Sequence, residues 1–315
     1  MLKGLVITPP VIGRIAIGRV VEKNGKRLPE KDDQFTITTQ VQQRGEWLLH
    51  PLNETLRKAD PGKPAGKLRA IPVRMLFNEP DLNLRADYSL FDRDTGRPAC
   101  VGNGETCRRV TDTGIENLAC PSPDGCAFGR QGGCKPYGRL NVAIGDEDEL
   151  GSFIFRTTSF NSIRTLSARL QYFSAVSGGL LACLPLELKL RGKSTTQSRR
   201  SAIYYVDLSV RSGCTLEQAL GEAKELDTRR RASGFDQAAL DAVARSGFAN
   251  GACEDSPDEQ AAVADEFYPH AASQPDSTGA PPGDPPPATQ TTDSPSSTLR
   301  EKLERKVALT GGKAA

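Results

Sequence analysis

The sequence predicts an α+β fold: a mainly antiparallel sheet with packed helices, a cysteine-rich insertion and a disordered C-terminal tail. Three observations support this prediction. Apolar residues alternate with polar ones in several short segments, which is typical of half-buried strands. Other segments place apolar residues at helical spacing behind a capping residue. From residue 251 onwards the composition shifts to Pro, Ser, Thr and Asp, so we expect the α+β body to span residues 1–250.

The N-terminal region has the pattern of antiparallel strands. Ile15 and Ile17 keep a two-residue spacing, and Asn24-Gly25 is the turn dipeptide of a two-residue hairpin. The alternation resumes at Phe35, so residues 14–40 are expected to form a hairpin or meander. After a loop at 58–67, further strands are expected at 70–77, 86–91 and 151–158.

Helices are expected in the second half of the chain. Ser159 or Asn161 can cap a helix that Gly178-Gly179 ends. The apolar face of this helix consists of Ile163, Leu166, Leu170 and Phe173. Thr215 and Gln218 have the spacing of a capping box, which predicts another helix. Strands are expected at 186–190 and 204–210, and a shorter helix at 236–245.

The C-terminal segment differs in composition from the body. Residues 251–297 contain few aliphatic side chains, so burial cannot offset the entropy lost on ordering, and we expect a disordered linker. Nine of its residues are Asp or Glu, and no Lys or Arg lies within residues 246–299. Thr298 and Glu301 form another capping box, which predicts a short amphipathic helix at 298–309.

The formal net charge of +2 conceals an asymmetry. Without the nine acidic residues of the linker, 41 basic residues stand against 30 acidic ones. A basic body suits nucleic acid or an acidic protein surface as partner, and it equally suits a merely solvated surface. No apolar run is long enough to cross a bilayer and no signal-peptide pattern opens the chain, so we expect a cytoplasmic protein without a membrane partner.

Five of the eight cysteines lie close together in the sequence: Cys100, Cys107, Cys120, Cys126 and Cys134. The surrounding segment, residues 100–138, is rich in glycine and poor in apolar side chains, so burial alone cannot hold it. Pro/Gly turns precede Cys126 and Cys134, and such turns allow thiolates to converge on a metal. The other three cysteines, Cys183, Cys214 and Cys253, are interpreted as small structural residues.

Zinc takes four thiolates in a tetrahedron and can supply folding energy to a segment without a core. We therefore expect one structural zinc ion held by Cys120, Cys126 and Cys134. Cys100, at the end of an expected strand, is preferred over Cys107 as the fourth ligand. Reduced structural cysteines are one alternative, and an iron–sulfur cluster is another.

The sequence carries no catalytic motif. Neither the phosphate-binding pattern GxxxxGK[ST] nor the nucleophile elbow GxSxG occurs. His50 follows an apolar stretch and is interpreted as structural, while His270 lies in the predicted linker. The acidic run at 145–150 is interpreted as a solvated turn. We therefore expect a protein without enzymatic activity.

Two parts of the sequence together resemble a known family. One is GRIAIGR at 13–19 with LPEKDDQFTITT at 28–39. The other is RAIPVRMLFNEPDLNLRADYSLFDRDTGRPACVGNGETCRR at 69–109, followed by CPSPDGCAFGRQGGCKPYGRL at 120–140. They resemble the recombination directionality factors of phages that use large serine integrases, and related proteins of integrative mobile elements that are often labelled hydrolase or metal-binding. The resemblance covers roughly residues 10–215.

The resemblance implies a regulatory, non-catalytic function. Such a factor binds its cognate serine integrase on attachment-site DNA and switches it from integration to excision, so that DNA is contacted indirectly or weakly. A second hypothesis is a zinc-containing DNA-binding accessory protein of mobile-element recombination, which the basic body favours. A third, a metal-dependent hydrolase or nuclease, lacks the histidines and paired carboxylates that it would need.

Overall fold

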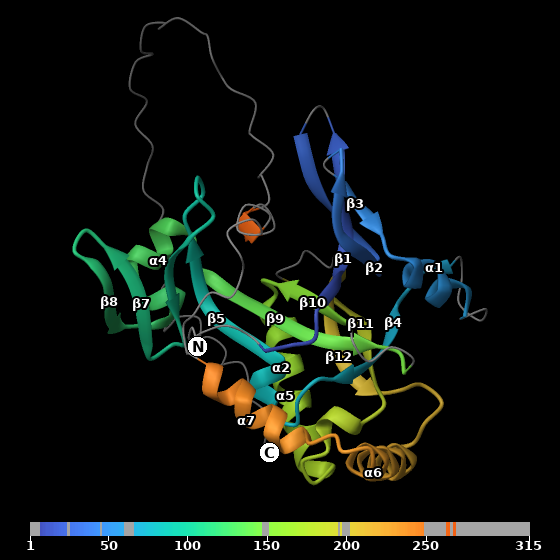
Figure 1. Cartoon of the computed structure of the whole chain (residues 1–315). Helices are drawn as coiled ribbons and strands as arrows, with labels where there is room; N and C mark the ends of the chain where they lie inside the picture. The colour runs from blue at the N-terminus through green and yellow to red at the C-terminus, as the bar shows by residue number, and fades with distance from the viewer. Residues whose placement is uncertain are drawn as a thin grey trace, which may run out of the picture. The chain divides into compact units, whose positions relative to one another are not determined.

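The computed structural model describes residues 7–23, 26–44, 46–59, 66–146, 151–194, 196, 202–248, 263–264 and 267–268. All of them belong to one compact unit, Met1–Ala272 (Figure 1). The expected helix at 298–309 lies outside the described residues, and so does most of the linker expected at 251–297. Among the described helices, none has both the length and the apolar character needed to cross a membrane.

Twelve strands form a single sheet in the described part of the chain. They are β1 (Val11–Lys23), β2 (Lys26–Gln43), β3 (Glu46–Leu49), β4 (Ala70–Met75), β5 (Leu84–Phe91), β6 (Pro98–Gly102), β7 (Thr106–Thr111), β8 (Gly114–Ala119), β9 (Lys135–Ile144), β10 (Ser152–Thr157), β11 (Leu186–Ser194) and β12 (Ala202–Val210). β1 and β10 run parallel. The other pairings among these strands are antiparallel, which confirms the mainly antiparallel sheet.

The sheet follows the order β3-β2-β1-β10-β9-β5-β6-β7-β8. β9 is its junction: one edge of β9 pairs with β10, and the other pairs with β5 through residues 135–140 and with β4 through residues 142–144. From β4 the sheet continues to β11 and then to β12. The β7–β8 hairpin therefore lies at the opposite end of the main order from β3.

Seven α-helices and a short 3₁₀ helix accompany these strands in the described residues. They are α1 (Pro51–Lys58), α2 (Pro80–Asn83), α3 (Ser122–Gly125), α4 (Ala127–Gly132), α5 (Phe160–Val176), η2 (Leu181–Cys183), α6 (Leu216–Ala232) and α7 (Gln237–Gly247). Together with the sheet they confirm the α+β class. α1 was not expected from the sequence.

α5 has the cap and the buried face expected from its sequence. Its N-cap is Ser159, whose hydroxyl accepts a hydrogen bond from the Ser162 N–H at 3.4 Å. Gly178 and Gly179, just beyond its end, have φ angles of 65° and 83°, which glycine adopts without strain. The buried apolar residues of this helix are Ile163, Leu166, Leu170 and Phe173, and the last three belong to the main core.

Later elements also begin where capping residues predicted. Both bonds of the Thr215–Gln218 capping box are present at the start of α6. α7 starts after Asp236, whose carboxylate accepts from the Ala239 N–H at 2.9 Å. The expected N-terminal hairpin is the β1–β2 pair, although its turn at Asn24-Gly25 lies outside the described residues.

Two expectations can be compared with the described residues. Residues 100–138 continue the main sheet, because β6 pairs with β5, and a zinc-binding role for this segment stays a prediction. Part of the expected disordered linker is ordered: Val263, Ala264, Phe267 and Tyr268 are described, and the first three are buried. Large apolar side chains in an otherwise polar segment explain this difference, since Phe267 packs against Phe91 in a small second core.

The acidic run at 145–150 is described only in its first two residues. Asp146 does not simply face solvent, because it accepts hydrogen bonds from Arg74 at 2.7 Å and from Arg211 at 2.5 Å. Arg74 lies on β4 and Arg211 directly follows β12. The carboxylate therefore ties the end of β9 to two other strands of the sheet.

Candidate metal centre

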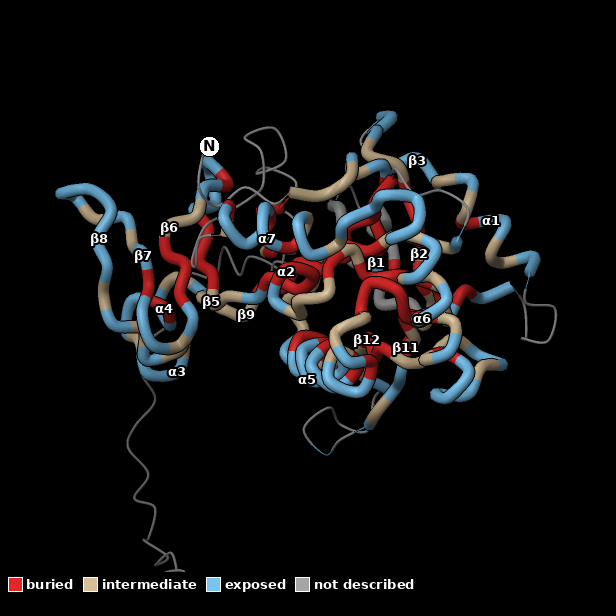
Figure 2. Tube along the Cα trace, turned by 60° about the horizontal axis from the view of Figure 1, so that its bottom comes forward, coloured by how far each residue is buried: buried red, intermediate tan, exposed pale blue. Residues whose placement is uncertain are grey.

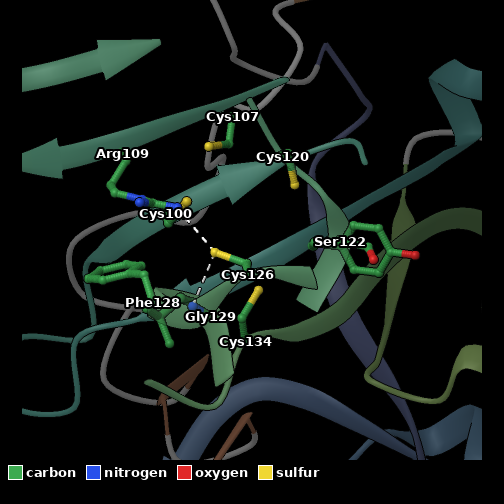
Figure 3. Close-up of a pocket in the computed structure, with 11 residues that line it drawn as sticks. Cys100, Cys107, Arg109, Cys120, Ser122, Cys126, Phe128, Gly129 and Cys134 are labelled. Atoms are coloured by element: carbon green, nitrogen blue, oxygen red, sulfur yellow. Dashed lines mark hydrogen bonds between the residues drawn. The ribbon is translucent and has the colours of Figure 1, made fainter. Parts of the chain in front are cut away.

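The five clustered cysteines all line one cavity beside the β6–β7 end of the sheet (Figure 3). Cys100 lies on β6 and Cys107 on β7, while Cys120 follows β8. Cys126 joins α3 to α4, and Cys134 separates α4 from β9. The structure thus brings together the four expected ligands and also the alternative, Cys107.

The β6–β7 turn places Cys107 beside this cavity. Asn103 shapes the turn, since its side-chain oxygen accepts from the N–H groups of Glu105 at 2.9 Å and Thr106 at 2.8 Å. In the resulting register Cys107 pairs with Gly102 and Arg109 pairs with Cys100. Because alternate residues of a strand share a face, Cys107 and Arg109 lie on the same side of β7.

Cys126 is the N-cap of α4. Its sulfur accepts from the Gly129 N–H at 3.3 Å and from the Arg109 guanidinium at 3.4 Å. The backbone hydrogen bond from Gly129, together with the charge and hydrogen bond of Arg109, lowers the pKa of the Cys126 thiol. Two hydrogen-bond donors, the Gly129 N–H and the Arg109 guanidinium, thus favour the thiolate form of Cys126.

Two other thiols are held in the neutral form by their surroundings. Burial raises the pKa of Cys134 to about 12, and the neighbouring Cys100, Cys120 and Cys126 add to the effect. Burial also raises the pKa of Cys107 to about 11, with further contributions from Cys100 and Cys120. Several thiolates so close to one another are unfavourable unless positive charge is placed among them.

Arg109 is a member of the site that the cysteine pattern did not identify. Its guanidinium contacts the Cys126 sulfur and lies over the Phe128 ring at 4.4 Å from the centroid. A hydrogen bond with Cys100 is the largest of the influences that raise its own pKa. The sequence signal was the i, i+2 spacing from Cys107 within a strand, which places both side chains on one face.

Within the described residues, no three Cys, His, Asp or Glu side chains lie in positions from which they could hold a metal ion together. The five thiols surround the cavity without closing on a common point. The expected zinc site therefore stays a prediction.

The remaining candidates have structural roles. His50 is the N-cap of α1, where its Nδ1 accepts from the Leu52 N–H at 3.2 Å, and its ring packs edge-on against Phe153. Burial lowers the pKa of this histidine. Cys183 lies in the main core and Cys214 packs against it, while Cys253 is outside the described residues.

The fold and the site define a class of protein: an α+β body whose main sheet ends in a cysteine-lined cavity with one arginine among the thiols. The chain belongs to the Gp3-like family, described as recombination directionality factor-like, whose family model matches residues 12–211. The match includes all of the sheet except its first residue, Val11, and all five cysteines of the cavity. It excludes α6, α7 and the described residues 263, 264, 267 and 268. No curated protein and no solved structure matches the chain.

Proposed function

We propose that this protein is a recombination directionality factor that binds a serine integrase and switches it from integration to excision without cutting DNA itself. The observation that carries this proposal is the family match over residues 12–211. Recombination directionality is the role that the family description names. The serine integrase as partner, and the sense of the switch, are the parts that we add.

A non-catalytic role agrees with how the buried carboxylates of the body are used. Glu187 accepts hydrogen bonds from Lys189 at 2.7 Å and from the Ser212 hydroxyl at 2.9 Å. Asp207 lies between Arg169 and Arg191, each at 3.2 Å. These groups are engaged in holding strands and helices together, which supports a scaffold rather than acid–base chemistry.

Such a factor acts through differential affinity. A protein that binds the excising arrangement of the integrase more tightly than the integrating one shifts the balance between them. Reversing a preference from about 1:99 to 99:1 requires roughly 10⁴-fold tighter binding to the favoured arrangement. Such an effect can come from a binding interface alone, with no chemistry at the factor.

A recombination assay with the integrase of the same element tests this proposal. Adding the protein should promote recombination between the two hybrid sites and suppress it between the original pair. An integrase from an unrelated element, with its own sites, is the matched control and should be unaffected. Unchanged direction at saturating protein would contradict the proposal.

The excess of basic residues outside the linker favours a second candidate, a DNA-binding accessory protein. This candidate requires binding to attachment-site DNA when no integrase is present. Its affinity should then fall steeply with salt, because each neutralised phosphate releases counterions. Tight, salt-dependent binding to bare DNA together with unchanged direction of recombination would favour it over the switch.

A further inference from the structure

Thiols from separate elements surround one very small cavity. The lining of this cavity also includes Arg109 and Phe128. Thiols that converge from several elements on one small space suit a shared metal ion.

Cys107 differs from the other four thiols in its contacts. The Cys134 thiol interacts with Cys100, Cys120 and Cys126, whereas the Cys107 thiol interacts with Cys100 and Cys120. Cys107 also donates its S–H toward the Ala119 carbonyl oxygen, at 3.8 Å. In Figure 3, Cys107 lies on the far side of Cys100 from Cys126 and Cys134. Cys107 is therefore the thiol least suited to a shared ligand.

The groups around the thiols suit a negatively charged centre. Four thiolates around one divalent cation carry a net charge of −2, and Arg109 places a positive charge beside the Cys126 sulfur. Gly129 donates a second hydrogen bond to the same sulfur. Donors of this kind orient metal-bound thiolates and stabilise their charge.

The segment that carries the thiols also has little else to hold it. Its apolar cluster has three buried members, Leu90, Cys100 and Cys107. β8 is exposed along almost all of its length, as Figure 2 shows. A cation shared by several elements would supply the missing stabilisation, because binding it requires the folded arrangement.

We propose that Cys100, Cys120, Cys126 and Cys134 bind one structural zinc ion, with Cys107 outside the coordination shell and Arg109 positioning the Cys126 ligand. Structural zinc sites commonly consist of four thiolates in a tetrahedron, at about 2.3 Å. Each thiol loses its proton on binding. The site is separate from the proposed integrase contact and does not depend on it.

Binding must draw the sulfurs together, since the described residues hold no set already at metal-binding spacing. The required movement is local. Cys126 and Cys134 flank α4, a helix of six residues that is not part of the sheet. Gly133, with φ of 80°, joins α4 to Cys134, and β6, which carries Cys100, is paired with β5.

Elemental analysis of the full-length protein, purified without chelators, should find one zinc per chain. Cys126→Ser should lose the metal, whereas Cys107→Ser and the control Cys214→Ser should keep it. Cobalt(II) in place of zinc should give the absorption of a tetrahedral thiolate complex. Arg109→Ala should weaken zinc binding by roughly 10- to 100-fold, and Arg108→Ala, in its exposed neighbour, should not.

If Cys126→Ser fails to fold, the zinc site can still be tested with the wild-type protein. Zinc should then protect four thiols from alkylation, and a chromophoric chelator should release them together with the metal. Folded protein that takes up no zinc would overturn the proposal, and so would iron in its place. Loss of zinc from Cys107→Ser with retention in Cys100→Ser would overturn the ligand assignment.

Discussion

Gly102 stands where a side chain would collide with the cysteine cavity. A Cβ added there would lie 2.6 Å from the Cys107 Cβ and 2.8 Å from the Cys120 sulfur. Close-packed atoms cannot approach so closely, so either the thiols or the strand would have to move. The nearby Gly104 is needed for a different reason, because it has the positive φ of the turn, 98°.

We therefore expect Gly102→Ala to destabilise the cysteine-bearing segment by about 1–3 kcal/mol, the usual range for overpacking. Urea unfolding of the purified variant measures this. Gly221→Ala is the matched control: its added Cβ meets no atom within 4 Å. Because Gly221 is inside α6, alanine should stabilise that helix by about 1 kcal/mol. Equal effects of the two substitutions would show that the cavity does not constrain residue 102.

Single residues also limited what the sequence could predict about the site. Cysteine and glycine spacing identified the thiols, because turns at Gly125 and Gly132-Gly133 direct the chain back on itself. Cys107 remained ambiguous, since its position depends on how β6 pairs with β7. Arg109 was not identified as part of the site, although its spacing from Cys107 placed it on the same face of the strand.

At the scale of elements, alternation and caps predicted the strands and helices that are half-buried. β9 was missed because it does not alternate: Arg139 and Asn141 are as buried as Leu140 and Val142. A strand at the junction of a sheet is covered on both faces, so its polar residues no longer mark the solvent side. β8 was missed for the opposite reason, since most of its residues are exposed.

The contacts of Asp146 join three elements and make a prediction about pH. Its hydrogen bond with Arg211, with the charges of Arg211 and Arg74, lowers the pKa of this carboxyl to about 2. A carboxyl whose pKa is depressed in the folded state stabilises that state above its unfolded pKa, about 3.9. This stabilisation is lost as the pH falls through the folded value, near 2.

Asp146→Asn should therefore lower the free energy of unfolding at pH 6, and the difference from wild type should shrink steadily below pH 4. The effect should be modest, since the Asp146 side chain is 45% exposed and water screens its ion pairs. Urea unfolding across the pH range measures it. Asp112→Asn, in the exposed β7–β8 turn, is the control. A difference that stays constant down to pH 2 would show that lost packing, and not charge, is responsible.

For the whole molecule, the way in which elements combine could not be predicted from local pattern. β1 pairs with β10, which lies about 140 residues later in the chain, and they run parallel. β4 pairs with both β9 and β11, which lie far from it in the sequence, and these two pairings are antiparallel. Periodicity specifies which face of a strand is buried and says nothing about its neighbour. The sequence therefore predicted the class of fold but not the order of the sheet.

The anchoring of Phe267 and Tyr268 likewise appears only at this scale. Phe267 is fully buried and packs edge-on against Phe91 and Tyr137. The Tyr268 hydroxyl donates to the carbonyl oxygens of Phe91 at 2.9 Å and Gly132 at 3.3 Å. Lys135 donates to the Phe267 carbonyl. Removing everything after residue 250 should therefore lower the stability of the body.

We expect Phe267→Ala to lower the free energy of unfolding by about 3–5 kcal/mol, as for other fully buried phenylalanines. Two truncated chains separate the anchor from the rest of the tail. A chain ending at residue 268 should keep the wild-type melting temperature, and a chain ending at residue 250 should lose as much stability as Phe267→Ala. Tyr268→Phe should cost only about 1 kcal/mol, because it removes the hydroxyl hydrogen bonds and leaves the ring. Thermal and urea unfolding measure all four proteins. Identical melting temperatures for the two truncated chains would show that Phe267 contributes nothing to the stability of the body.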